Sequence, residues 1–130
     1  MTKFTSNSDF IRCFYKKYNF DKPVSSVPSF KDYLDPNMKV IFNNESFGPS
    51  EITGLIETFY TSMYSIKIDI VGDIKCLNEE EGIYLVLSNW HCKTMKGSEG
   101  ICPMVEIITI KEFKIVHAIA MMDTTEIGRF

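Results

Sequence analysis

Long hydrophobic runs and clustered basic residues are both missing from this sequence of 130 residues. No run approaches the roughly 18 uncharged apolar residues that a membrane-spanning helix needs, so no membrane contact is expected. The 14 basic residues are scattered among 17 acidic ones, without a stripe that could neutralise a phosphate backbone, so nucleic acid is not expected as a partner. The N-terminal residues lack the apolar segment of a signal peptide, which predicts a cytoplasmic protein.

Residues that hold metals, cofactors or disulfide frameworks are also few. The two histidines lie far apart, and neither they nor the four cysteines show the spacing of a zinc site, so no metal is expected. A glycine-rich phosphate loop is absent, and we expect no cofactor. Cys92 and Cys102 flank a predicted hairpin turn and could lie close together; two reduced thiols packed as small apolar groups are favoured over a disulfide.

Apolar residues, and aromatic residues above all, are abundant. Hydrophobic residues make up 45% of the chain and aromatic residues 13%. The length predicts a single domain over residues 1–130, because a second independent core would not fit. The rings of this domain can fill a large core or line a cavity.

Three helices are expected in the first half of the chain. Ser8 can cap a helix over residues 8–19, whose apolar residues form one broad face. A short helix is expected over residues 30–34. A third is expected over residues 48–63, where a proline suits the first helical position and apolar residues recur at helical spacing.

Strands dominate the second half of the chain. Short turns join the last of them, which predicts antiparallel pairing. The last three strands are apolar at nearly every position, so both of their faces must be covered. The helices cover one face, and we expect a second copy of the chain to cover the other in a homodimer through the sheet face. Strands are expected over residues 38–43, 66–70, 83–94, 101–111 and 114–122.

Three stretches of the sequence resemble motifs of one superfamily. Residues 40–44 resemble its first strand, residues 48–52 the glycine and helix start that follow, and residues 114–124 its last strand. The chain is thus similar to the nuclear-transport-factor-2-like superfamily, in particular to SnoaL-like and ketosteroid-isomerase-like domains. The resemblance implies an α+β fold with three N-terminal helices packed on a strongly curved, mainly antiparallel sheet, a cone-shaped α+β barrel around a pocket. Isomerases, cyclases, dehydratases and non-enzymes share this fold, so the pocket residues must decide the function.

The carboxylates that serve catalysis in this superfamily are mostly missing here. The position of the isomerase base falls on Asn44, and an amide cannot accept a proton near neutral pH. The cyclase His and Asp positions fall on two alanines of the last strand. Glu106 lies at or beside the position of a protonated isomerase acid and is the catalytic candidate, with Tyr15 or Tyr18 as hydroxyl donor. Glu106 could instead be paired with a lysine or solvated at an edge.

The resemblance implies a pocket for a small apolar molecule. The expected function is binding of such a molecule, with isomerase- or cyclase-type activity as an open extension. The alternative is a non-catalytic protein-interaction module like the import factor that names the fold. Strand alternation places Trp90 and His91 on opposite faces, so with Trp90 at the pocket His91 points away from it. The predicted pocket residues are Phe14, Tyr15, Tyr18, Phe42, Asn44, Phe47, Phe59, Trp90, Met104, Ala118, Ala120 and Met122.

Overall fold

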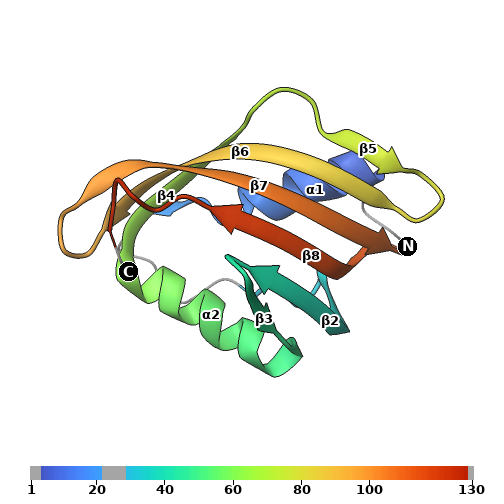
Figure 1. The fold of residues 1–130 in the computed structure, drawn as a ribbon, viewed down its shortest axis with the longest axis horizontal. Coiled ribbons are helices and arrows are strands. Elements are labelled where there is room, and N and C mark those ends of the chain that lie inside the picture. The colour runs from blue at the N-terminus through green and yellow to red at the C-terminus, as the bar shows by residue number, and fades with distance from the viewer. Residues whose placement is uncertain (1–3, 22–28, 129–130) are drawn as a thin grey trace.

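A computed structural model describes residues 4–21 and 29–128 of the chain (Figure 1). Helix α1 spans Asn7–Lys16. Its cap is Ser6 rather than the predicted Ser8, because the Ser6 Oγ accepts a hydrogen bond from the Asp9 N–H at 3.0 Å. The Asp9 carboxylate in turn accepts a hydrogen bond from the Thr5 N–H at 3.1 Å, so side chains satisfy two backbone donors at the helix start.

The helix expected over residues 30–34 is not formed, and this prediction was wrong. The N–H of Leu34 bonds to the carbonyl of Phe30 in a single turn, and strand β2 (Leu34–Phe42) begins at once. Leu34 pairs with Ile115 far along the chain, and one isolated turn is too short to compete with that pairing. The described residues therefore contain two α-helices rather than three.

Helix α2 (Pro49–Ser62) begins where the sequence predicts. The Glu51 Oε1 accepts a hydrogen bond from the N–H of Gly48 at 2.9 Å, which fixes the start of the helix. Ile52 and Phe59 are buried on the face of α2 that packs against the sheet. The helix ends where β4 begins, so the chain passes from helix to strand without a loop.

Eight strands form one mixed sheet in the described part of the chain. Their order is β1-β4-β6-β7-β8-β2-β3, with β5 paired to β6, and only β2 and β8 run parallel. The sheet is mainly antiparallel, as predicted, but it is open rather than a closed barrel, with β1 and β3 at its edges. In Figure 1, β6 and β7 arch over α1. Besides β2, the strands are β1 (Phe20–Asp21), β3 (Glu45–Phe47), β4 (Met63–Ile70), β5 (Lys75–Asn78), β6 (Ile83–Thr94), β7 (Glu99–Lys111) and β8 (Lys114–Met122).

The long strands β6, β7 and β8 match their predicted ranges, except that β7 starts slightly earlier, at Glu99. The short strands β1, β3 and β5 were not predicted. Each has at most four residues, which is too few for an alternating pattern to stand out. These strands form because a neighbouring strand offers free backbone groups, a condition that the local sequence does not show.

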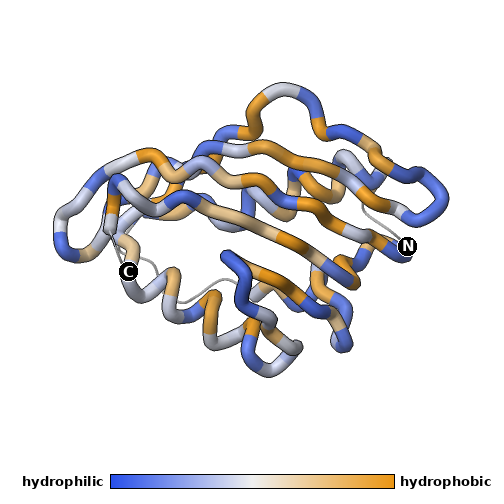
Figure 2. The backbone as a smooth tube through the Cα atoms, viewed as in Figure 1, coloured by the Kyte–Doolittle hydropathy of each residue, from blue (hydrophilic) through white to orange (hydrophobic). Residues whose placement is uncertain are grey.

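The two faces of the sheet differ in what covers them. Trp90, Met104 and Ile108 on the inner face are buried. The outer face also carries apolar side chains on β6, β7 and β8, yet Val105 is 46% exposed and Met121 is 56% exposed. The hydropathy colouring in Figure 2 shows many hydrophobic residues along the central strands. We name as the outer patch the two cross-strand rows Leu87, Val105, Met121 and Leu85, Ile107, Ile119.

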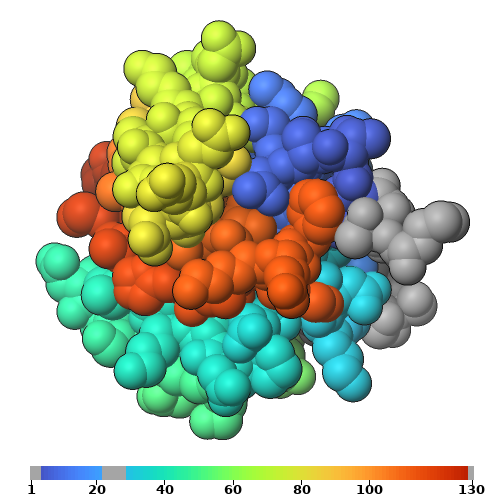
Figure 3. Space-filling view, turned by 90° about the vertical axis from the view of Figure 1, so that its right-hand side faces the viewer, coloured from blue at the N-terminus to red at the C-terminus, as the bar shows by residue number. Residues whose placement is uncertain are grey.

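Aromatic rings fill the end of the molecule where α1 begins. The ring centroid of Phe10 lies 5.0 Å from that of Phe4, 5.3 Å from that of Tyr33 and 6.1 Å from that of Phe113. Figure 3 shows this end, where the β7–β8 turn lies beside α1. Part of the aromatic content thus serves as core packing. Neither helix in the described ranges has the length and hydropathy to cross a membrane.

Candidate functional site

An apolar cavity of about 100 Å³ lies between the inner face of the sheet and the two helices. Side chains from α1, α2, β2, β6, β7 and β8 line it, so segments far apart in the sequence meet there. Most of the predicted site residues are among the lining residues: Phe14, Tyr15, Tyr18, Phe42, Phe59, Trp90, Met104, Glu106, Ala118, Ala120 and Met122.

Further apolar residues line the cavity that the sequence analysis did not assign to it. Helix α2 contributes three of them, whose helical spacing was recognised in the sequence although they were not assigned to the pocket. The others lie on β2 and β8, and among them only Leu34 precedes the predicted start of its strand at residue 38. These additional lining residues are Leu34, Met38, Val40, Ile52, Leu55, Ile56 and Ile115.

Asn44 and Phe47 do not line the cavity, contrary to the prediction. Asn43 and Asn44 have φ values of 47° and 70°, and they form the tight turn between β2 and β3, in which Asn44 is exposed. Asparagine tolerates this left-handed conformation, so these residues act as turn formers. The Asn43 side chain also holds β8, because its Oδ1 accepts from the Met122 N–H at 2.8 Å and its Nδ2 donates to the Met122 carbonyl at 3.2 Å.

Glu106 lies at the centre of the inner face and points into the cavity. Its cross-strand neighbours are Val86 on β6 and Ala120 on β8, so no charged residue flanks it in the sheet. The hydroxyl of Tyr15 donates a hydrogen bond to the Glu106 Oε1. Of the alternatives left open by the sequence, Glu106 is thus a buried cavity acid rather than a lysine-paired or edge residue. Tyr15 donates to Glu106 itself, and the role of Tyr15 or Tyr18 as hydroxyl donor to a bound molecule stays a prediction.

The surroundings of Glu106 change its proton affinity. Burial raises the pKa of the Glu106 carboxyl from 4.5 to about 7, although the hydrogen bond from Tyr15 works in the opposite direction. Burial, together with the nearby Glu106 charge, also raises the pKa of Tyr15 and of Tyr18 well above 10.0, so both hydroxyls stay protonated near neutral pH. The site therefore holds a carboxyl group that exists in both forms near neutral pH and two phenols that can donate hydrogen bonds.

Trp90 anchors a wall of rings around the cavity. Its ring centroid lies 5.0 Å from that of Tyr18, 5.7 Å from that of Phe59 and 6.3 Å from that of Tyr15. The Trp90 Nε1 donates a hydrogen bond to the Oγ of Ser88 at 3.0 Å, so its polar group is satisfied within β6. The rings thus present an apolar surface to the cavity.

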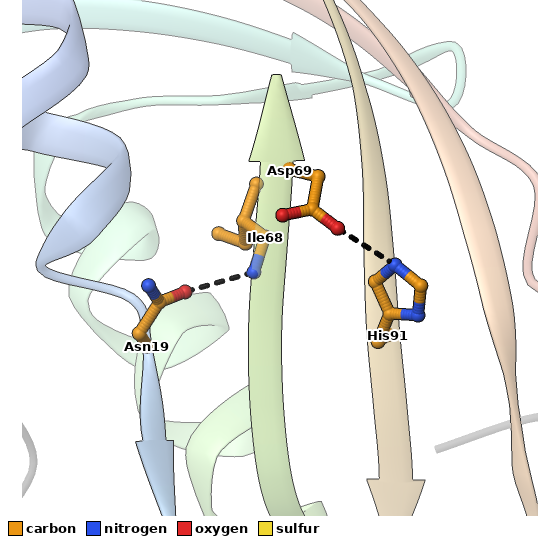
Figure 4. A network of polar contacts seen from close by, with 4 residues as sticks. All are labelled: Asn19, Ile68, Asp69 and His91. Carbon is orange, nitrogen blue, oxygen red and sulfur yellow. Dashed lines mark hydrogen bonds and ion pairs between the residues drawn. The ribbon is translucent and has the colours of Figure 1, made fainter. Parts of the chain in front are cut away.

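The two histidines do not line the cavity. As alternation predicts, His91 faces the other way from Trp90, and its Nε2 lies 3.0 Å from the Oδ2 of Asp69 (Figure 4). Beside this pair, the Asn19 Oδ1 accepts a hydrogen bond from the N–H of Ile68 at 2.8 Å and so ties the segment after α1 to β4 (Figure 4). These polar groups support the sheet rather than the cavity.

All four cysteines are free, and Cys92 and Cys102 are both buried. A hydrogen bond between the two thiols, with burial, raises the pKa of Cys92, and the same bond lowers the pKa of Cys102. They pack as reduced thiols, the state that the sequence favoured. Within the described ranges, no cluster of three or more His, Cys, Asp or Glu residues could hold a metal ion.

No family model matches this sequence, and no curated protein matches it. Solved structures do share its fold. IdmH, a candidate polyketide cyclase from Streptomyces antibioticus, is 11% identical with a TM-score of 0.73, over 94% of this chain and 95% of that one. A protein of unknown function from Burkholderia pseudomallei, described as NTF2-like, is 14% identical with a TM-score of 0.73, over 96% and 100% of the two chains.

A SnoaL-like candidate polyketide cyclase from Jannaschia sp. CCS1 is 11% identical with a TM-score of 0.63, over 78% of this chain and 77% of that one. At these identities the likeness concerns the fold. The chain has the nuclear-transport-factor-2-like fold of SnoaL-like proteins, and the fold implied by the sequence motifs is confirmed in that respect.

Proposed function

We propose that the cavity binds one small, mostly apolar molecule and that Glu106 is its principal polar contact. The observation that carries this proposal is a ring-lined cavity with a single carboxyl group, which Tyr15 holds in place. Ligand sites commonly combine an apolar wall with a few placed polar groups. The alternative, a protein-interaction module, led us to expect a filled cone, and the cavity favours ligand binding over it.

Xenon and tert-butanol test the proposal, because both are small enough to enter a modest apolar cavity. We expect either probe to shift the amide NMR signals of cavity residues, among them Trp90 and Glu106, in a saturable manner. Ala118→Leu should fill the cavity and abolish these shifts, whereas Val105→Leu, which enlarges a residue of the outer patch, should preserve them. Equal shifts in wild type and Ala118→Leu would show that the probes bind elsewhere.

A second candidate function is proton transfer to and from a bound molecule. It is favoured by the pKa of about 7 of Glu106, because an acid–base catalyst works best with a pKa near the operating pH. Exchange of the methyl protons of acetone with D₂O, followed by NMR, measures this activity. Glu106→Gln should slow protein-dependent exchange by at least about 100-fold, the lower bound for a general base. Glu80→Gln, in an exposed turn, should leave it unchanged, and no exchange above buffer in wild type would refute catalysis.

We further propose that the outer patch pairs with the same patch of a second copy in a homodimer. The patch carries no charge, so a matching apolar surface can cover it without desolvating an ion, and a two-fold axis supplies such a surface. Light scattering at micromolar concentration should give twice the 15.0 kDa of one chain. Val105→Lys places a charge in the outer patch and should give the mass of a single chain. Glu80→Lys, outside the patch, should give the same dimer mass as the wild type. A wild-type protein that is monomeric would contradict the proposal.

A further inference from the structure

The wall of the cavity carries one group of full charge among the described residues, the carboxylate of Glu106. Tyr15 on α1 and Tyr18 just after this helix are the other titratable side chains that face it, and both are neutral near pH 7 because burial raises their pKa values. The lining residues contributed by α2, β2, β6 and β8 hold no titratable group. The cavity thus has negative charge available and no cation of its own to balance it.

A buried carboxylate in such surroundings is costly unless an opposite charge lies beside it. Tyr15 offers a hydrogen bond but no positive charge. In the described part of the chain this is the only hydrogen bond to the Glu106 carboxyl, so its second oxygen is available to a ligand. A cationic ligand gains an ion pair here that a neutral ligand of the same shape does not, and an anionic ligand meets repulsion.

The rings favour the same kind of ligand. The ring centroid of Trp90 lies 5.0 Å from that of Tyr18 and 5.7 Å from that of Phe59, both pairs edge to face, and these rings line the cavity together with Phe14. The faces of Trp, Tyr and Phe rings attract cations, most strongly where water is excluded. The rings and the carboxylate therefore attract the same sign of charge, while the aliphatic lining suits alkyl groups.

The cavity volume limits the size of the ligand. A dry cavity of about 150 Å³ admits benzene, which has six heavy atoms. In proportion, the cavity of about 100 Å³ accommodates about four heavy atoms. That size fits a small methylated ammonium ion inside the cavity.

We propose that the cavity selects a small alkyl-substituted ammonium cation, which places its charge against Glu106 and its alkyl groups against the ring wall. This inference rests on the proposed function, because it names the ligand class of the same cavity. It specifies a cation where the proposed function requires only a small, mostly apolar molecule.

Tetramethylammonium is a suitable probe, because its charge is permanent and any pH dependence must come from the protein. Its neutral counterpart is tert-butanol, which has the same number of heavy atoms. Titration calorimetry at about pH 8.5 should show the cation binding at least about tenfold more tightly than tert-butanol. At about pH 5.5 only about 3% of Glu106 is ionised, so the cation should bind up to about 30-fold more weakly, whereas tert-butanol should be nearly unaffected.

Two variants separate the charge of Glu106 from other causes. Glu106→Gln should reduce cation affinity to that of tert-butanol and remove its pH dependence, while Glu80→Gln should preserve both. Binding of tert-butanol with equal or weaker binding of the cation would overturn this inference and leave the proposed function standing. Cation affinity that is independent of pH in the wild type would also overturn it. If neither probe binds at the highest concentration tested, both this inference and the proposed function are overturned.

Discussion

Replacing Glu106 with glutamine should change how the stability of this protein depends on pH. The folded protein holds the Glu106 proton up to about pH 7, because burial disfavours the charged carboxylate, whereas an exposed glutamate releases it near 4.5. Between these pH values the folded state binds a proton that the unfolded chain has lost, so the free energy of unfolding falls as the pH rises. At 1.36 kcal/mol per pKa unit, the wild type loses about 3 kcal/mol over this interval.

Urea unfolding at a series of pH values measures this effect, with the fluorescence of Trp90, the single tryptophan, as the signal. We expect the stability of Glu106→Gln relative to wild type to rise by about 3 kcal/mol from about pH 4.5 to about pH 8 and then to level off, because glutamine has no proton to lose. The difference cancels every group that titrates equally in both proteins. Glu80→Gln removes an exposed carboxylate from a turn and should give a nearly constant difference.

Parallel stability curves for wild type and Glu106→Gln would refute this reasoning. They would mean that the Glu106 carboxyl is as well solvated in the folded protein as in the unfolded chain. The cavity would then be open to water at this position, and both the proton-transfer and the cation-binding proposals would lose their physical basis.

Two further variants test local features. Tyr15→Phe removes a hydrogen bond that favours the charged carboxylate, so it should raise the pKa of Glu106 further. The midpoint of the same pH series should then move to higher pH, and an unchanged midpoint would contradict the bond. Gly82→Ala should cost at least about 2 kcal/mol, because a Cβ at φ +68° would lie 2.2 Å from the Ile110 carbonyl oxygen. Gly72→Ala, at φ +70° with open space around it, should lower the free energy of unfolding by only about 1 kcal/mol. If urea unfolding gives the same loss for both variants, the clash with Ile110 is not the cause.

The sequence predicted those elements whose pattern repeats over many residues. Alternation and nearly continuous apolar runs located β6 and β8, and the helical spacing after Pro49 located α2. The sequence was less informative where a short segment can form either a helical turn or a strand. The turn after Phe30 looked like the start of a helix, but pairing with β8 made it the entry to β2.

The sequence predicted the apolar, ring-rich character of the candidate site, but only part of the set of residues that line it. Glu106 was singled out because a lone acid in an apolar strand needs an explanation, and it does point into the cavity. Asn44 was placed at the site by analogy with a motif, but two consecutive positive φ values make it part of a turn. The contribution of Leu55 and Ile56 from α2 was missed, because periodicity shows which face of a helix is apolar and not what that face meets.

By itself, the sequence determined the order of the main elements and the face of each strand on which a side chain lies, because both follow from the short repeat of the backbone. It thereby placed Trp90 and His91 on opposite faces of their strand. Only the tertiary structure decided that Tyr15, 91 residues away, donates to Glu106, and that a cavity remains between the helices and the sheet. The reason is that such contacts depend on how distant segments pack against one another, which no local pattern encodes.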